Sequence, residues 1–334
     1  MDPAPAVGAA LNRIHAGIAC VLLAAPPLAA ADRYAVVVTG ASGGSPYAEK
    51  YDAWRASVVT TLEQKLGYPS DHIVVLAEQA AAPVRRATRD EVRAAFQDLV
   101  KRVAKDDVVF VMLIGHGTSG DEGARFNLVG PDLTAAEWAA LIKPIAGRMI
   151  FVNGASGSFE FLEALSGRGR VVVTAADSAA QQYETVFPEF FIAAFGEEQA
   201  DLDRNGRISI WEAFQTASGR VRKWFEDQGR LATERPLLDD NGDGIGREAE
   251  DGPEPTKERD GALAQATFLQ RDAPVATGTD AGLAALLRER ADVQSRIDRL
   301  RDGKADIPPD QYERELEALL VELARLERQI RSKS

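Results

Sequence analysis

"VVFVMLIGHGT", residues 108–118, is an apolar run that ends in Gly-His-Gly. A second stretch, "FVNGASGSF" at residues 151–159, continues the apolar residues 149–150 and ends in small residues. Unbroken apolar runs closed by a glycine turn are typical of strands buried on both faces of a parallel sheet. Ligands of such sheets lie at the carboxyl ends of the strands. We therefore expect His116 and residues 153–158 to lie side by side at a functional site.

The rest of residues 32–198 alternates between strand and helix patterns. Capping boxes, Thr88-x-x-Glu91 and Thr134-x-x-Glu137, open two of the helices. Strands are predicted at residues 34–40, 72–77, 108–115, 148–153 and 170–176, and helices at 47–66, 88–103, 134–141 and 159–165. Alternation of this kind predicts an α/β fold with a mainly parallel sheet covered by helices on both faces.

Net charge and one apolar stretch near the N-terminus indicate which partners and which location the protein has. The chain has 334 residues and a net charge of −12, which argues against a nucleic acid or an anionic membrane as ligand. The apolar stretch "AGIACVLLAAPPLAAA" follows Arg13 and His15 and ends in small residues. It predicts a secretory signal peptide at residues 1–31, and hence a periplasmic or secreted protein, with a short buried helix as the alternative. No other run reaches the length of a membrane span.

The predicted cleavage has a chemical consequence. Cys20 is the only cysteine of the chain and lies inside the predicted signal peptide. The mature protein would then contain no thiol, which excludes disulfides, thiolate nucleophiles and cysteine metal sites.

The strand-end motifs resemble the caspase/legumain-like (peptidase C13-like) cysteine peptidases of the bacterial branch. "GHG" ends one strand, Ser-Gly follows the next, and "RVVVTAADS" and "YETVFPEFF" fit the same pattern, so that the resemblance covers roughly residues 33–195. In that family a histidine and a cysteine form the catalytic dyad, and the cysteine precedes x-Ser-Gly. The resemblance places His116 at the dyad histidine and Gly154 at the cysteine, which implies a domain that has lost its nucleophile.

Two alternatives remain at this position. Ser156 and Ser158 are nearby hydroxyls, and an active hydrolase would need one of them, or another non-cysteine nucleophile, within reach of a general base. His116 would otherwise be a structural histidine or part of a vestigial pocket. Backbone amides near Gly154 offer a place for a peptide or an anion.

The most specific motif of the chain is "DLDRNGRISIWE", residues 201–212, which matches the twelve-residue EF-hand loop. Such loops bind Ca²⁺ through positions 1, 3, 5, 7, 9 and 12, with glycine at position 6 for a sharp turn. The predicted calcium ligands are Asp201, Asp203, Asn205, the backbone carbonyl of Arg207, Ser209 and Glu212. Gly206 stands at position 6. An exposed acidic turn without metal is the alternative.

A second acidic stretch, "DDNGDGIGREAE" at residues 239–250, follows the same pattern less closely. Asp239, Asn241, Asp243 and Glu250 fall at positions 1, 3, 5 and 12 and are the further predicted ligands. Gly246 replaces the apolar residue usual at position 8, and Gly252-Pro253 stops an exiting helix. We expect residues 199–252 to form a calcium module whose two loops pair around a shared core.

The C-terminal part contains a linker and two helices. "EDGPEPTKERDG" at residues 250–261 is charged and rich in proline, and "GALAQATFL" at 261–269 predicts one more edge strand within a linker over 253–278. Apolar stripes at 283–300 and 312–330, separated by "GKADIPPD", predict an antiparallel helical hairpin at 279–334. The hairpin would pack on a partner or on the main domain.

Taken together, the patterns favour an exported calcium-binding protein with a catalytically degenerate caspase/legumain-like domain, acting as a binding or scaffold protein rather than an enzyme. Its partners would be calcium ions and a peptide or protein that meets the strand-end cleft or the hairpin. Two other functions remain open: an active hydrolase of this peptidase family with a non-cysteine nucleophile, and a calcium-stabilised structural protein.

Overall fold

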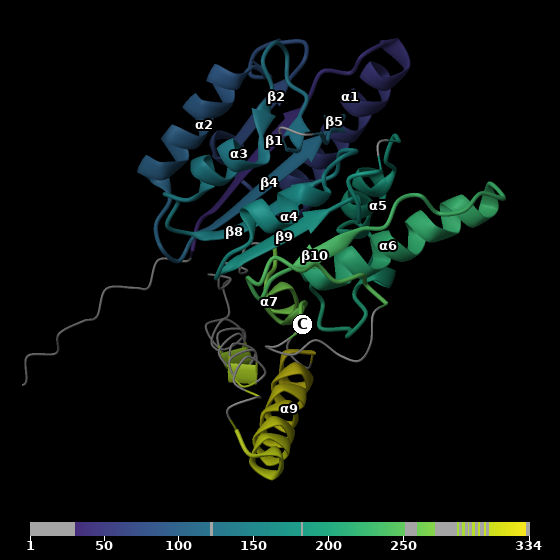
Figure 1. Cartoon of the computed structure of the whole chain (residues 1–334). Coiled ribbons are helices and arrows are strands. Elements are labelled where there is room, and N and C mark those ends of the chain that lie inside the picture. The colour runs from purple at the N-terminus through teal and green to yellow at the C-terminus, as the bar shows by residue number, and fades with distance from the viewer. Residues whose placement is uncertain are drawn as a thin grey trace, which may run out of the picture. The chain divides into compact units, whose positions relative to one another are not determined.

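The computed structural model describes residues 31–120, 123–181, 183–250 and 259–270 (Figure 1). In the C-terminal part it describes residues 286, 289–290, 293, 296–297, 300, 304 and 307–331. The predicted signal peptide up to residue 30 lies outside the described residues, as do 251–258 of the predicted linker and 271–285.

The central element is a seven-stranded sheet with the order β10-β9-β8-β4-β1-β2-β3. All neighbouring strands are parallel except β10, which runs antiparallel to β9. The strands are β1 (Arg33–Thr39), β2 (Ile73–Ala77), β3 (Arg85–Arg86), β4 (Val108–Ile114), β8 (Arg148–Asn153), β9 (Arg170–Thr174) and β10 (Leu237–Asp239). The mainly parallel α/β sheet predicted from the sequence is confirmed.

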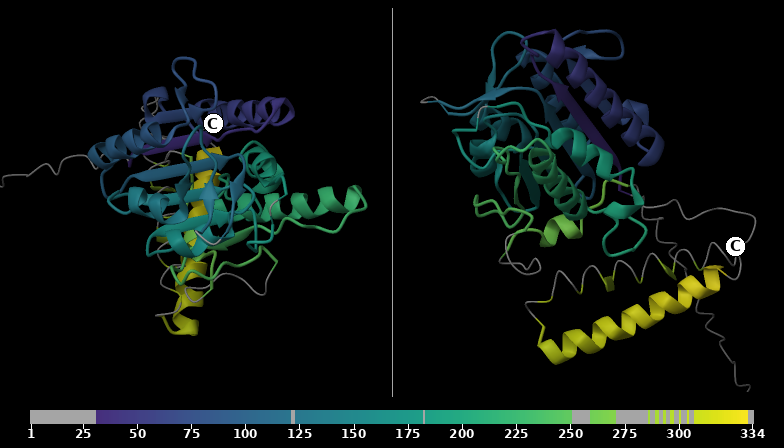
Figure 2. Two further views of the ribbon diagram at one scale, coloured as in Figure 1. Left: turned by 45° about the horizontal axis from the view of Figure 1, so that its top comes forward. Right: turned by 90° about the vertical axis from the view of Figure 1, so that its right-hand side faces the viewer.

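Helices cover both faces of this sheet because alternate residues of each strand point to opposite sides. Val37 and Phe110 belong to one core, and their neighbours Val36 and Val111 belong to the other. Figures 1 and 2 show the helices in two layers around the sheet. The first core contains α1 (Ser45–Thr60), α5 (Phe187–Ala194) and α6 (Ile210–Asp227); the second contains α2 (Arg89–Arg102), α3 (Ala135–Ile142) and α4 (Phe159–Leu165).

A small three-stranded antiparallel sheet follows β4 and was not expected. It consists of β5 (Gly117–Thr118), β6 (Arg125–Phe126) and β7 (Leu133–Thr134), in that order. Strands of two residues are too short to show any periodicity in the sequence, which explains why they were missed. The sheet begins directly after His116, and Gly117 of β5 is hydrogen-bonded to Ser156 in the turn after β8.

The predicted edge strand at 261–269 is wrong. Residues Ala262–Gln265 form the short helix α7, and the edge of the sheet is β10, 22 residues or more earlier in the chain. Position 268 makes only an isolated bridge, to Ser209. Since β10 pairs with β9, and α5 and α6 share a core with the sheet, the core continues across the boundary expected at residue 198.

The C-terminal helix α9 (Pro309–Arg331) packs against the described helical residues between 286 and 300. Val293, Ile297 and Leu300 form a buried cluster with Leu319 and Leu326. The ion pairs Arg290–Glu327 and Arg296–Glu322 show that the two segments run antiparallel, because the partner numbers fall as the first numbers rise.

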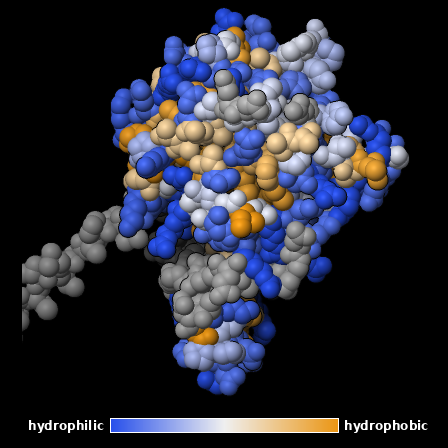
Figure 3. All heavy atoms as spheres, in the orientation of Figure 1, coloured by the Kyte–Doolittle hydropathy of each residue, from blue (hydrophilic) through white to orange (hydrophobic). Residues whose placement is uncertain are grey.

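The face drawn in Figure 3 is largely hydrophilic towards its rim, and apolar residues gather across its middle. Among the described residues, no helix is both long enough and apolar enough to span a membrane.

Candidate functional site

The first acidic loop lies between two helices of the main core. α5 ends at Ala194, a 3₁₀ turn follows at Glu198–Ala200, and α6 begins at Ile210. Two left-handed residues bend the chain between them, Arg204 with φ 57° and Gly206 with φ 82°. Glycine adopts this conformation without steric cost, so its presence at position 6 fits the turn.

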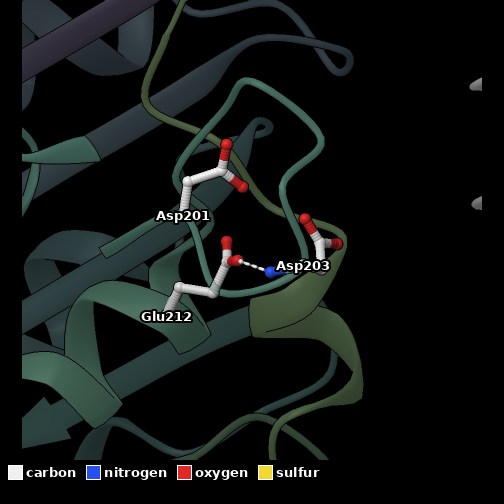
Figure 4. Close-up of side chains that lie close together, drawn as sticks. All are labelled: Asp201, Asp203 and Glu212. Atoms are coloured by element: carbon white, nitrogen blue, oxygen red, sulfur yellow. Dashed lines mark hydrogen bonds between the residues drawn. The ribbon is translucent and has the colours of Figure 1, made fainter. Parts of the chain in front are cut away.

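Three carboxylates converge on the space that this loop encloses. One oxygen each of Asp201, Asp203 and Glu212 lies within 4.8 Å of the others. Figure 4 shows Asp201 and Glu212 extending into the loop, with Asp203 across from them. Glu212 is 5% exposed, so its negative charge is almost fully withdrawn from water. Buried charges of one sign are costly unless they are paired or coordinate a metal.

Backbone donors of the loop hold these carboxylates in place. The Asn205 and Gly206 amides donate to Asp201 at 2.9 and 2.7 Å. The amides at positions 202 and 203 donate to one oxygen of Glu212 at 2.9 and 3.2 Å. A carboxylate has about four acceptor sites. Asp201 uses two of them and so retains capacity for a cation, whereas Glu212 also accepts the Ser209 amide and hydroxyl and has all four engaged.

The remaining predicted ligands serve the same loop. Ser209 is the N-cap of α6 and forms a capping box with Glu212, its hydroxyl donating to the carboxylate at 2.7 Å. The Asn205 side chain accepts the Arg207 amide at 2.8 Å. The Arg207 guanidinium lies 4.0 Å from the centre of the Phe268 ring and donates to the Gln270 carbonyl at 3.4 Å. The structure therefore brings Asp201, Asp203 and Glu212 together, with Asn205 and Ser209 beside them.

The second acidic loop follows β10 and repeats the backbone path of the first. Its left-handed residues are Gly242, φ 86°, and Gly244, φ 78°, at positions 4 and 6. The amide at position 6 donates to the aspartate at position 1 in both loops, here Gly244 to Asp239 at 3.3 Å. The amide at position 7 donates to the side chain at position 5 in both, here Ile245 to Asp243 at 2.7 Å.

The carboxylate that completes the second loop is Asp260, not Glu250. Oxygens of Asp239, Asp243 and Asp260 lie within 4.8 Å of one another. Asp260 accepts the amides at positions 2 and 3 of its loop at 2.8 and 3.1 Å. Glu212 accepts the amides at the same two positions of the first loop. Asp260 is thus the structural counterpart of the glutamate at position 12.

The predicted ligand Glu250 takes a different role, as the ion-pair partner of Arg222 on α6. Glu250 is not among the carboxylates that converge, and Gly246 stands at position 8, where the first loop has Ile208. Asp260 was missed because it lies near the end of the charged stretch 250–261, where no twelve-residue pattern starting at Asp239 could include it. Its one local signal is the following glycine, Gly261, which is left-handed with φ 113°.

Burial raises pKa values in the second cluster. It is the largest contribution that raises the pKa of Asp260 to about 7, and the negative charges of Asp240 and Asp239 raise it further. Burial also raises the pKa of Asp240, whose carboxylate accepts the Gly261 and Ala264 amides at 2.8 and 2.7 Å and so caps α7. The cluster therefore holds more negative charge than its surroundings readily support, which favours a bound cation.

No bridge or strand pair joins residues 201–212 to residues 239–250, all of which the structure describes, so the expected pairing of the two loops is not seen there. Ser209 of the first loop bridges to Phe268, with the Ile210 amide donating to the Thr267 carbonyl at 2.9 Å. Asp260 of the same segment completes the second cluster. Residues 259–270, with α7 between these contacts, thus connect the two acidic clusters.

His116 lies at the carboxyl end of β4 as predicted, but it faces α1. Its Nε2 is 3.1 Å from the Tyr51 hydroxyl, and the Tyr47 ring packs against it edge-on at 4.8 Å. Burial raises the pKa of the Tyr51 phenol, which keeps it protonated as a donor. Burial also lowers the pKa of His116, with Lys50 adding to this and Glu184 and the Ser42 backbone opposing it. The His116 ring is thus engaged by the Tyr51 hydroxyl at the carboxyl end of β4.

The turn after β8 has no room for a nucleophile at residue 154. A Cβ on Gly154 would lie 2.5 Å from Cγ of Pro188 and 3.1 Å from the Leu113 carbonyl oxygen. Neither nearby hydroxyl is free. Ser156 donates to the Gly117 carbonyl and accepts its amide, and Ser158 accepts the Ala176 amide at 3.1 Å. Both serines are buried, at 2% and 0% exposure.

Comparison with known proteins assigns no family. No protein-family model and no curated protein matches the chain. A crystal structure of a Geobacter sulfurreducens protein from a structural-genomics programme resembles it with a TM-score of 0.43 and 12% sequence identity, over 72% of this chain and 99% of that one.

Proposed function

We propose that the protein binds calcium ions at two loops, and that these ions stabilise a fold without peptidase activity. The observation that carries this proposal is the convergence of Asp201, Asp203 and Glu212 inside a loop with EF-hand spacing. Oxygen ligands at this density suit Ca²⁺, a hard cation that takes six to eight of them. Asp239, Asp243 and Asp260 provide the second, less complete set.

The role at the strand ends is that of a binding protein rather than a hydrolase. The caspase/legumain-like resemblance remains our hypothesis for the origin of the sheet. Two observations support the loss of catalysis. A Cβ added at Gly154 would clash with Pro188, and the hydroxyls of Ser156 and Ser158 are already hydrogen-bonded. Export after removal of residues 1–31 would expose both loops to extracytoplasmic calcium, and affinities of such modules are as weak as roughly 10⁻⁴ to 10⁻³ M.

Calorimetric titration tests the metal proposal. We expect two Ca²⁺ per chain, one after Glu212→Gln and one after Asp260→Asn, because each substitution removes one carboxylate of one cluster. Glu250→Gln is the matched control and should retain both ions, since Glu250 pairs with Arg222. If Asp260→Asn kept two ions and Glu250→Gln lost one, Glu250 rather than Asp260 would be the ligand of the second loop, as the sequence predicts. No binding by the wild type would end the proposal.

A further inference from the structure

Helix α9 has apolar residues on two faces. One face holds Leu319 and Leu326, which are buried in the hairpin. The other is a shallow groove lined by Leu316, Leu320, Val321 and Ala324 together with Glu313 and Glu317. Leu320 is 43% exposed and Val321 64% exposed. We call this second surface the outer face of α9.

The charged residues of the outer face are separated by sign. Glu313 and Glu317 line the N-terminal part of the groove, and the exposed Arg328 lies outside its lining, about two helical turns beyond Val321. None of these three is in an ion pair among the described residues. Glu322 and Glu327, by contrast, are engaged by Arg296 and Arg290 within the hairpin. The outer face therefore has an acidic end and a basic end, each without a partner of its own.

We propose that the outer face is the interface of a homodimer in which two copies of α9 pair antiparallel. Leu320 and Val321 lie at its middle. Glu313 precedes Leu320 by seven residues (320 − 313) and Arg328 follows Val321 by seven (328 − 321). Seven residues are close to two helical turns, so all four share one side of the helix. A two-fold axis between Leu320 and Val321 places Glu313 opposite Arg328 of the partner subunit, twice per dimer.

This arrangement identifies a second copy as the occupant. An isologous interface requires a surface that is complementary to itself, and the charge order of the outer face meets that condition only when the helices are antiparallel. A parallel pair would place Glu313 against Glu313 of the partner subunit. The contact is one helix face wide, smaller than the interfaces of stable complexes, so we expect a dissociation constant in the micromolar range.

Sedimentation velocity on the full chain, over about 1 to 100 μM at low salt, tests the proposal. Val321→Asp should abolish dimerisation because it places two charges in the apolar middle. Glu313→Arg and Arg328→Glu should each raise the dissociation constant about tenfold, since each converts two attractions into repulsions. The double variant Glu313→Arg/Arg328→Glu should return it to within about twofold of wild type.

Leu231→Asp is the control, because Leu231 is 90% exposed on the main domain and lies outside the interface. It should dimerise like the wild type, and far-UV circular dichroism should show equal helix content in all variants. A wild type that stays monomeric would overturn the proposal, as would a dimer insensitive to Val321→Asp. Failure of the double variant to recover would overturn the antiparallel arrangement. Calcium binding by these variants is measured separately and does not bear on the outcome.

Discussion

At the scale of single residues, Gly154 determines what the strand-end region can do. Any side chain there would meet Pro188 of α5 and the Leu113 carbonyl of β4. The space that a Cβ needs at this position is filled by the first turn of a neighbouring helix. The sequence showed only that the residue was glycine, whereas the packing shows that a side chain here would require Pro188 to move.

Substitutions at this position should destabilise the protein. We expect Gly154→Ala to lower the free energy of unfolding by about 1–3 kcal/mol, the usual cost of overpacking a core. Gly154→Cys should do the same and gain no peptidase activity. Gly120→Ala is the control, because no atom lies within 4 Å of its added Cβ, and its effect should stay within about 0.5 kcal/mol. Urea denaturation measures both, and an unchanged midpoint for Gly154→Ala would show that Pro188 yields.

Glu234 is a second residue with a decisive position, and no sequence pattern indicated it. It is 2% exposed, and its two oxygens accept the Val186 and Phe187 amides, both at 2.8 Å, at the start of α5. Burial raises the pKa of Glu234 to about 7, and the negative charge of Glu184 adds to this rise. The two hydrogen bonds and Lys50 lower the pKa, but by less than burial raises it. It thus holds the start of the helix that leads into the first acidic loop, and its burial favours the protonated form.

This raised pKa predicts a pH dependence of stability. Between about pH 4.5 and 7 the folded protein keeps a proton on Glu234 that the unfolded chain releases. The contribution of this group to stability is therefore largest at the acidic end and falls by roughly 3 kcal/mol as the pH rises to 7. We expect Glu234→Gln to remove this slope. Denaturation of both proteins at several pH values measures the difference, and parallel curves would contradict the prediction.

At the scale of elements, sequence patterns identified what is local. The five main strands and the capped helices follow from apolar runs and capping boxes, and the first acidic loop follows from twelve consecutive residues. The patterns failed where one element is completed by a distant one. Asp260 completes the second loop from 21 residues beyond Asp239 (260 − 239), and β10 rather than 261–269 forms the sheet edge. Short strands such as Leu237–Asp239 are too short to show periodicity. Contacts between residues on either side of a linker cannot be recognised from the spacing of residues in the sequence.

At the scale of the whole molecule, the acidic loops belong to the main core. α5 and α6 pack on the sheet, β10 extends it, and residues 259–270 link the loops. A cation that joins Asp201 to Glu212 therefore ties together elements that cover one face of the sheet. Its binding free energy should stabilise the sheet as well as the loop, which an independent module would not do.

Calcium should accordingly protect the whole described core. A ligand that binds only the folded state adds about 2.7 kcal/mol at a hundredfold excess over its Kd, which for a domain of this size raises the Tm by roughly 5–10 °C. Hydrogen exchange locates the gain: amides of β4 and β8 should slow with calcium together with those of α6. Glu212→Gln should lose most of the effect in all three elements. Protection confined to α6 and the two loops would instead show that they fold as a separate module, with a boundary near residue 198 as the sequence predicts.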